Sequence, residues 1–392
     1  MTNNSPSKWP CYSADEIEAV KKVLSTGKGN SLSGQKCKEF EIEFAKFSNT
    51  KFAVALMNGT VALEASLKVL GVGPGDEVIV TPRSFIASVS CVVNVGARPI
   101  FADVDINSGN ITSETISSVI SEKTKAVICV HIGGWPCEMD AICHLSKERN
   151  FFVIEDCSQA HGAKYKGQSV GSFGDIGTWS FCHDKIISTG GEGGMVTTND
   201  SNIYEKLWSI KDHGKDRTKF LNSKYGSRFN WLHDSFGTNL RMTEMQAAIG
   251  IIQLRKIDSW KKKRTKNAYS IQKTLELLSK DNKSIRLVIP YKHIEHAYYR
   301  FYFYLRNTNE TEINYRDQVI DSLNNLGLYC FSGSCSEIYN EKAFLEGNFR
   351  PKTPLTNAKL LGEQSVALLV HPTMSNNEIN FSIEVLKRVL KK

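Results

Sequence analysis

The first half of the chain alternates short apolar runs with amphipathic segments, and this pattern constrains the fold more than any other feature. Apolar runs that suit strands lie at 52–57, 77–81, 99–103, 125–131, 151–156, 176–181 and 194–198. Helical spacing of apolar residues lies between most of them, at 59–70, 84–95, 113–121 and 139–149. Strands that alternate with helices are typical of a parallel sheet covered on both faces. The sequence therefore predicts an α/β fold around a mostly parallel, seven-stranded sheet.

The second half of the chain predicts a smaller α+β unit. We expect helices at 202–213, 316–326 and 377–390, a strand at 298–305, and a long helix over 243–278 with a break allowed within it. The long helix is expected to link two domains, a large one over 1–255 and a small one over 256–392. A chain of 392 residues with 41% hydrophobic content is long enough to bury two cores.

Lys185 is the first candidate for chemistry. It lies in the stretch T-W-S-F-C-H-D-K-I-I-S-T-G-G-E-G-G, Thr178 to Gly194, which predicts a strand, an exposed loop and a return strand. A lysine held between two strands loses its charge readily and can attack carbonyl groups. A solvated lysine beside a flexible glycine turn is the alternative.

Asp156 ends the apolar run Phe151–Asp156, which suits a buried parallel strand. Ligands of such sheets bind at the carboxyl ends of the strands. A carboxylate and a lysine placed there are what pyridoxal phosphate requires, because the lysine forms a Schiff base and the carboxylate keeps the pyridinium nitrogen protonated. The alternative for Asp156 is a helix N-cap.

A phosphate site is predicted where the strand at 52–57 meets the helix at 59–70. Asn58, Gly59 and Thr60 form a small polar turn there, and backbone N–H groups at a helix N-terminus bind anions. Ser180, upstream of Lys185, is a further candidate phosphate ligand. A plain N-cap is the alternative for this turn.

Together these motifs resemble the DegT/StrS family of sugar aminotransferases, which are fold type I pyridoxal-phosphate enzymes of the aspartate aminotransferase superfamily. The resemblance rests on N-G-T-V-A-L at 58–63, E-D-C-S-Q-A-H-G-A at 155–163 and S-F-C-H-D-K before G-E-G-G. It is supported by P-R-S-F-I-A-S at 82–88 and by G-T-N-L-R-M-T-E-M-Q-A-A-I-G at 237–250. It runs from about Trp9 to about Leu254 and is weaker beyond.

The resemblance implies a role for each matching residue. Lys185 would be the Schiff-base lysine and proton shuttle, and Asp156 would pair with the pyridine nitrogen. Gln159 would lie near the ring hydroxyl and Phe85 on the ring face. Asn239 would reach the phosphate of the neighbouring subunit, so the protein would be a homodimer with shared active sites. The remaining cofactor-binding residues would hold the phosphate: Asn58, Gly59, Thr60 and Ser180.

The resemblance also implies an amino transfer from glutamate to a keto or aldehyde sugar, in surface polysaccharide or lipopolysaccharide biosynthesis. S-F-C-H-D-K-I-I-S-T-G-G-E-G-G at 180–194, together with K-D-H-G-K at 211–215, suggests the branch that aminates an 8-oxo-3-deoxy-octulosonate. A nucleotide-linked 3- or 4-keto-6-deoxy sugar is the alternative acceptor. Lys185 argues against the family's sugar dehydratase, in which histidine replaces the lysine, and we expect His183 at the pocket rim. A non-enzymatic regulator is the remaining alternative.

Two further expectations concern the substrate and the catalytic lysine. The candidates for the sugar pocket are His213, Arg241, His296, Tyr298 and Arg300. A lysine that acts as a base must be neutral, so the site is expected to lower the pKa of Lys185.

Composition excludes several other classes. The ten cysteines form no CxxC pair, which favours free thiols in a reducing cytoplasm and no metal site. No apolar run approaches the ~18 residues of a membrane span, and the first residues lack a signal-peptide core. No GxGxxG or GxxxxGK[ST] motif occurs. The net charge is +8, and we interpret the basic run Arg255–Lys266 as a solvated helix face, with no nucleic-acid partner.

Overall fold

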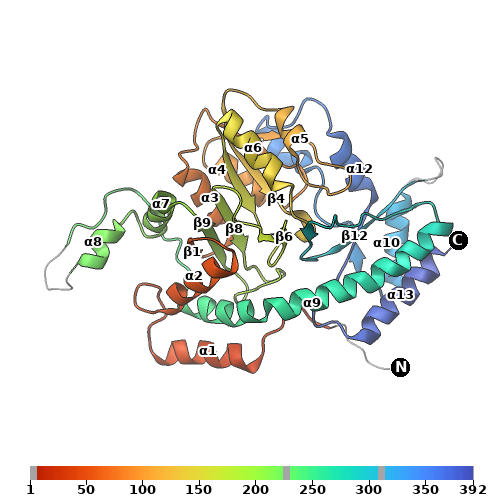
Figure 1. Cartoon of the computed structure of the whole chain (residues 1–392), viewed down its shortest axis with the longest axis horizontal. Helices are drawn as coiled ribbons and strands as arrows, with labels where there is room; N and C mark the ends of the chain where they lie inside the picture. Colours follow the sequence, from red (N-terminus) through yellow and green to blue (C-terminus); the bar gives the residue numbers. More distant parts are fainter. Residues whose placement is uncertain (1–6, 224–229, 308–313, 392) are drawn as a thin grey trace.

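The structure is a computed structural model that describes residues 7–223, 230–307 and 314–391 (Figure 1). Its centre is a seven-stranded sheet in the order β1-β9-β8-β5-β4-β2-β3. The run from β8 to β3 in this order is parallel, and β9 is antiparallel to both of its neighbours. All the predicted strands are in it: β1 (Phe52–Leu56), β2 (Glu77–Val80), β3 (Arg98–Phe101), β4 (Thr124–Val130), β5 (Phe152–Asp156), β8 (Ile176–Ser180) and β9 (Gly194–Thr198).

Helices cover both faces of this sheet, which explains why its strands are apolar throughout. Val54 and Leu56 of β1 belong to one core cluster, together with residues of the helices on their side. Ala53 and Ala55, which alternate with them, pack on the other face against Phe40. The helices of this part are α1 (Ala14–Ser25), α2 (Lys36–Phe47), α3 (Gly59–Val69), α4 (Ala87–Asn94), α5 (Ser113–Ser117), α6 (Met139–Arg149), α7 (Ser201–Lys211) and α8 (Arg217–Asn222).

The long helix α9 (Glu244–Asp281) is unbroken over 38 residues and runs below the sheet in Figure 1. Thr243 and Gln246 form a capping box at its start. The helix packs against α1 and α2 near that end and against α13 near the other. The expected division between residues 255 and 256 falls inside this helix and stays a prediction.

The C-terminal part has its own sheet and helices, as expected. A four-stranded sheet runs in the order β10-β12-β14-β13, and a small sheet β11-β6-β7 joins this part to the first half. The remaining strands are β6 (Lys164–Tyr165), β7 (Gln168–Ser169), β10 (Ile285–Arg286), β11 (Ile294–Glu295), β12 (Phe301–Leu305), β13 (Cys330–Phe331) and β14 (Ser365–Leu368). The remaining helices are α10 (Tyr315–Asn325), α11 (Lys342–Glu346), α12 (Thr356–Gln364) and α13 (Asn376–Leu390).

Several predicted boundaries shift for local reasons. The strand expected from residue 298 begins at Phe301, because Tyr298 has a positive φ of 50° that an extended strand excludes. The helix expected from residue 84 begins at Ala87. All ten cysteines are free thiols, and most of them are buried. Within the described ranges, no helix has both the length and the apolar character needed to cross a membrane.

The basic run Arg255–Lys266 is only partly the solvated face we expected. Lys256 forms an ion pair with Glu16 at 3.0 Å. Arg264 is fully buried and donates to the backbone carbonyls of Tyr298 and Tyr299. The prediction is wrong at Arg264, because the N-terminal segment covers this side of α9 and places the Trp9 ring 5.0 Å from its guanidinium.

Candidate active site

The first turn of α3 forms an anion-binding corner. Asn58 caps the helix, and its side-chain oxygen accepts a hydrogen bond from the Val61 N–H at 3.0 Å. The N–H groups of Gly59 and Thr60 have no acceptor within the helix, as in any first helical turn. A Cβ added at Gly59 would lie 2.7 Å from the Ser180 Cβ, so glycine is required for this close approach. Asn58 can therefore cap the helix while the N–H groups of the same turn stay available to a phosphate.

Asp156 and its neighbour Glu155 have separate functions because successive strand residues point to opposite faces. Asp156 accepts hydrogen bonds from the Ser88 hydroxyl at 2.8 Å and from the Ser158 N–H at 3.1 Å. Glu155 instead accepts from backbone N–H groups of Gly171, Phe173 and Gly174. The residues after Asp156 form turns up to β6, so the helix N-cap interpretation of Asp156 is wrong.

Lys185 lies in the loop between β8 and β9, as predicted, and the solvated alternative is wrong because only 15% of its side chain is exposed. Its ammonium lies 3.6 Å from Asp184 and 5.1 Å from the centre of the Tyr299 ring. Its backbone carbonyl accepts a hydrogen bond from the Trp9 indole at 2.9 Å. The N-terminal segment and the C-terminal part of the chain therefore both contact this lysine.

The pKa of Lys185 differs from the expectation. Burial lowers this pKa, but Tyr299 and the carboxylates of Asp184 and Asp156 raise it by more in total, so it lies above its ordinary value. The prediction that the site lowers the pKa of Lys185 is therefore wrong for the protein without its cofactor. The sequence did not show that Tyr299 and Asp184 lie beside the amine.

The predicted residues converge on one cavity, which we call the Lys185 cavity. It has a volume of about 390 Å³, within the range of small-molecule sites. It brings together eight of the nine candidates: Asn58, Gly59, Thr60, Phe85, Asp156, Gln159, Ser180 and Lys185. His183 also lines it, with an exposed side chain. Asn239 is the exception, since it does not line the cavity.

A second cavity adjoins it, which we call the outer cleft. Its volume is about 430 Å³, and Phe85, Gln159 and Lys185 line both spaces. Arg300 lies in the outer cleft, where its guanidinium is 4.2 Å from the centre of the Tyr299 ring. The only anion paired with Arg300 in the described ranges is Asp184, at 3.7 Å.

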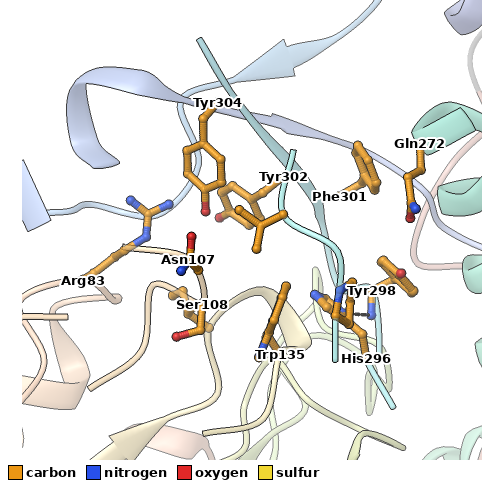
Figure 2. A pocket seen from close by; sticks show the side chains of 13 residues that line it. Arg83, Asn107, Ser108, Trp135, Gln272, His296, Tyr298, Phe301, Tyr302 and Tyr304 are labelled. Carbon is orange, nitrogen blue, oxygen red and sulfur yellow. Dashed lines mark hydrogen bonds between the residues drawn. The ribbon is translucent and has the colours of Figure 1, made fainter. Parts of the chain in front are cut away.

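The other four candidates for a sugar pocket lie elsewhere. His296 and Tyr298 line a separate cavity (Figure 2), which shares Tyr302 with the outer cleft. Arg241 forms a 2.6 Å ion pair with Asp212, and His213 is an exposed residue with a positive φ of 59°. Arg300 alone among the five candidates reaches the neighbourhood of Lys185.

Four residues that the sequence did not predict also lie at the site. Ser88 donates to Asp156, and Ser84 lies 2.9 Å from the Ser88 hydroxyl. Asp184 accepts from the Tyr299 hydroxyl beside Lys185. Two signals pointed to them: both serines lie in the P-R-S-F-I-A-S motif, and Asp184 precedes the lysine. Nothing local pointed to Tyr299, since it comes from the distant C-terminal part.

The site fits pyridoxal phosphate on these observations. The α3 corner offers unpaired N–H groups and the hydroxyls of Thr60 and Ser180 to a phosphate. A nearly buried lysine and a buried carboxylate line the same cavity. These are the groups that the imine link and the pyridine nitrogen of this cofactor require.

Comparison with known proteins identifies the family. The model of the DegT/DnrJ/EryC1/StrS aminotransferase family matches residues 10–387. The GDP-perosamine synthase of Escherichia coli O157:H7 is 36% identical over 383 residues, which cover 97% of this chain and 96% of that protein. An aminotransferase from Psychrobacter cryohalolentis is 48% identical, with a TM-score of 0.95 and 98% of each chain covered.

A more distant solved relative agrees. DesV of Streptomyces venezuelae, solved in complex with a ketimine intermediate, is 27% identical with a TM-score of 0.84, over 97% of this chain and 95% of that one. The chain therefore belongs to the DegT/DnrJ/EryC1/StrS aminotransferase family, whose enzymes are pyridoxal-phosphate-dependent transaminases of fold type I.

Proposed function

We propose that this enzyme transfers the amino group of glutamate to a keto sugar carried on a nucleotide. The observation that carries the proposal is that the Lys185 cavity and the outer cleft adjoin, with Phe85, Gln159 and Lys185 in both linings. The cleft has a volume of about 430 Å³, which is large enough for a sugar. The GDP-perosamine synthase relative is named for a nucleotide-linked amino sugar, which supports this class of acceptor.

K-D-H-G-K, one of the two stretches that suggested the octulosonate acceptor, does not reach the site. His213, the centre of that motif, lines neither the Lys185 cavity nor the outer cleft. Lys215 of the same motif is paired with Asp212 at 3.0 Å. The charged residues of the motif are thus paired within the fold, since Lys211 also pairs with Glu41 at 3.4 Å. We therefore propose the nucleotide-sugar alternative in place of the octulosonate.

The proposed roles follow from the positions of the side chains. When bound, pyridoxal phosphate supplies an electron sink for the carbon that loses its proton. Asp156 would keep the ring nitrogen protonated, while Ser88 and the Ser158 N–H keep this carboxylate oriented. The amine of Lys185 would carry the proton between the two carbons of the transfer. Gln159 accepts from the Gly133 N–H at 2.7 Å, which leaves its amide N–H₂ to face the ring hydroxyl.

Arg300 is the proposed partner of the donor's carboxylate. The rings of Tyr299 and Phe331 flank its guanidinium at 4.2 and 5.5 Å and orient it. Its ion pair with Asp184 is long, at 3.7 Å, so a carboxylate that makes two parallel hydrogen bonds can compete for it.

Incubation of the holoenzyme with glutamate and a panel of nucleotide-linked 3- and 4-keto sugars tests the function. We expect one of them to gain an amino group in mass spectrometry, with one 2-oxoglutarate formed for each aminated sugar. Free octulosonate in its 8-oxo form serves as the competing acceptor and should stay unchanged. Loss of water without consumption of glutamate would instead indicate the dehydratase. A protein that binds the cofactor and converts none of these sugars would contradict the proposal.

We also propose that the active enzyme is a two-fold symmetric homodimer in which Asn239 serves the partner's site. Asn239 is exposed and does not line the cavity of its own chain, and its side chain only accepts from the Arg241 N–H at 3.3 Å. The same segment exposes two large apolar side chains, Trp231 at 83% and Phe236 at 103%. Exposed apolar groups of this size indicate a surface that another chain covers.

Hybrid dimers test this arrangement. Mixed Lys185→Ala and Asn239→Asp chains should recover toward half of the wild-type activity per hybrid, because one site then receives both intact halves. The matched control mixes Lys185→Ala with Asp156→Asn chains. Each site of that hybrid keeps one defect, so no recovery is expected. Proven chain exchange without recovery in the first mixture would place Asn239 outside the partner's site.

A further inference from the structure

Arg83 is a buried cation without a counter-ion. Its residue is 1% exposed, and its Nη1 donates to the Ser336 hydroxyl at 2.7 Å. The guanidinium also lies 5.5 Å from the centre of the Tyr302 ring. Its Nε has no hydrogen-bond partner, and no carboxylate of the described ranges lies within ion-pair distance. An unpaired buried charge is costly, so such a group calls for a partner.

Arg83 lines a small cavity of mixed polar and apolar lining, which we call the Arg83 cavity (Figure 2). In this view Arg83 is on one side, Tyr302 and Tyr304 are above, and Trp135 and His296 are below. The cavity offers about 30 Å³ to the centres of water-sized molecules. Since a single water needs roughly 10–15 Å³ on this scale, the space suits two waters or one monatomic ion with one water. It is too small for a sugar or a nucleotide.

The other polar groups around the cavity offer donors. The Tyr304 hydroxyl has no hydrogen-bond partner among the described residues, and burial raises the pKa of this phenol, so it keeps its proton. Asn107 uses its side-chain oxygen to accept from Arg286 at 3.5 Å, which leaves its N–H₂ group free to donate. Arg286 adds positive charge, with its guanidinium 4.2 Å from the centre of the Tyr304 ring.

Asp105, an acidic group that acts on Tyr304 and Arg286, has one oxygen engaged elsewhere. Asp105 is close enough to influence Tyr304, yet it does not line the cavity. One of its oxygens accepts from the N–H groups of Asn107 and Ser108 and from the Ser108 hydroxyl. Donors and positive charge therefore face this space, and no carboxylate of the described residues lines it.

We propose that the Arg83 cavity binds a monatomic anion of the size of chloride, held by Arg83, Tyr304 and Asn107. Water alone would satisfy the hydrogen bonds of these groups and would leave the charge of Arg83 uncompensated. An anion of this size fits the cavity, accepts the hydrogen bonds of these groups and compensates the charge of Arg83.

The anion would also support the segment that lines the Lys185 cavity. Ser84, next to Arg83, donates its N–H to the Cys335 carbonyl at 3.0 Å, and its hydroxyl contacts Ser88, which donates to Asp156. Tyr302 lines both the Arg83 cavity and the outer cleft. Occupancy of the cavity therefore stabilises this part of the folded enzyme.

Thermal unfolding of the holoenzyme tests the proposal directly. Sodium chloride is titrated against sodium gluconate at constant ionic strength, because gluconate is too large for the cavity. We expect the Tm to rise with chloride and to saturate. Arg83→Met should abolish the saturable rise and should be at least as stable as the wild type without chloride, since it removes the buried charge. The matched control is Arg98→Met, whose arginine is exposed and donates to the Asn348 carbonyl.

Two further measurements keep the test decisive if Arg83→Met fails to fold. Tyr304→Phe removes one donor and should raise the chloride concentration at half-saturation by about tenfold. Wild-type crystals grown with sodium bromide should show anomalous signal between Arg83 and Tyr304. An equal rise of the Tm in wild type and Arg83→Met, or only water in the cavity, would overturn the proposal. Bromide in the crystal without a saturable rise in solution would mean an adventitious ion only, and would overturn it as well.

Discussion

Replacement of Lys185 by alanine should lower the transamination rate by at least ~10⁴-fold, because Lys185 is the proposed covalent anchor of the cofactor and the proposed proton carrier. Borohydride treatment of the wild-type holoenzyme should fix the cofactor on one peptide, the one that contains Lys185. The Lys185→Ala protein should show no fixed label and should lose the visible absorption of the attached cofactor. A label on any other lysine would contradict the assignment.

Lys211 provides the control for a buried lysine. It is 6% exposed and forms an ion pair with Glu41 at 3.4 Å, away from the Lys185 cavity. Lys211→Met should keep the labelling pattern and the rate per folded molecule.

The raised pKa of Lys185 adds a pH dependence. Below a raised pKa the amine is protonated and cannot attack a carbonyl, so covalent uptake of pyridoxal phosphate by the cofactor-free protein should become faster as the pH rises. Uptake followed by absorbance measures this rate, and a rate that falls with pH would contradict the direction.

Replacement of Asp156 by asparagine should reduce the rate by roughly 10²-fold or more, which is on the order of 3 kcal/mol of transition-state stabilisation. The amide keeps the shape of the side chain and its acceptor for the Ser158 N–H, and the Ser88 hydroxyl can rotate to accept from the new N–H₂ group. The fold should therefore persist while the ring nitrogen loses its anionic partner. Steady-state rates and the absorption spectrum of the bound cofactor check this result.

The adjacent carboxylate provides a matched control. Glu155 is buried like Asp156 but accepts from the N–H groups of Gly171, Phe173 and Gly174. Glu155→Gln should destabilise the fold by about 1–3 kcal/mol and leave the cofactor spectrum of the folded protein unchanged. Near-normal activity of Asp156→Asn, or a changed cofactor spectrum in Glu155→Gln, would show that the roles proposed for the two carboxylates are wrong.

The sequence by itself determined the elements of the fold and the parts of the site that are local. Strand and helix periodicities depend on neighbours within a few residues, and the helix over 139–149 forms with these bounds. The phosphate corner at Asn58–Thr60 and the lysine loop are each one turn between two elements. The carboxyl ends of parallel strands lie at one edge of a sheet. The sequence could therefore also predict that Asp156 lies close to these two turns.

Only the tertiary structure decided which distant groups meet. Arg300 reached the Lys185 neighbourhood while His296 and Tyr298 lined another cavity, because β12 begins at Phe301, after the positive φ of Tyr298. The pKa of Lys185 rises through Tyr299, which comes from the C-terminal part of the chain. The burial of Arg83 without a counter-ion arises between segments far apart in the sequence. Electrostatic and packing terms of this kind depend on three-dimensional distances, and no local pattern of residues encodes those distances.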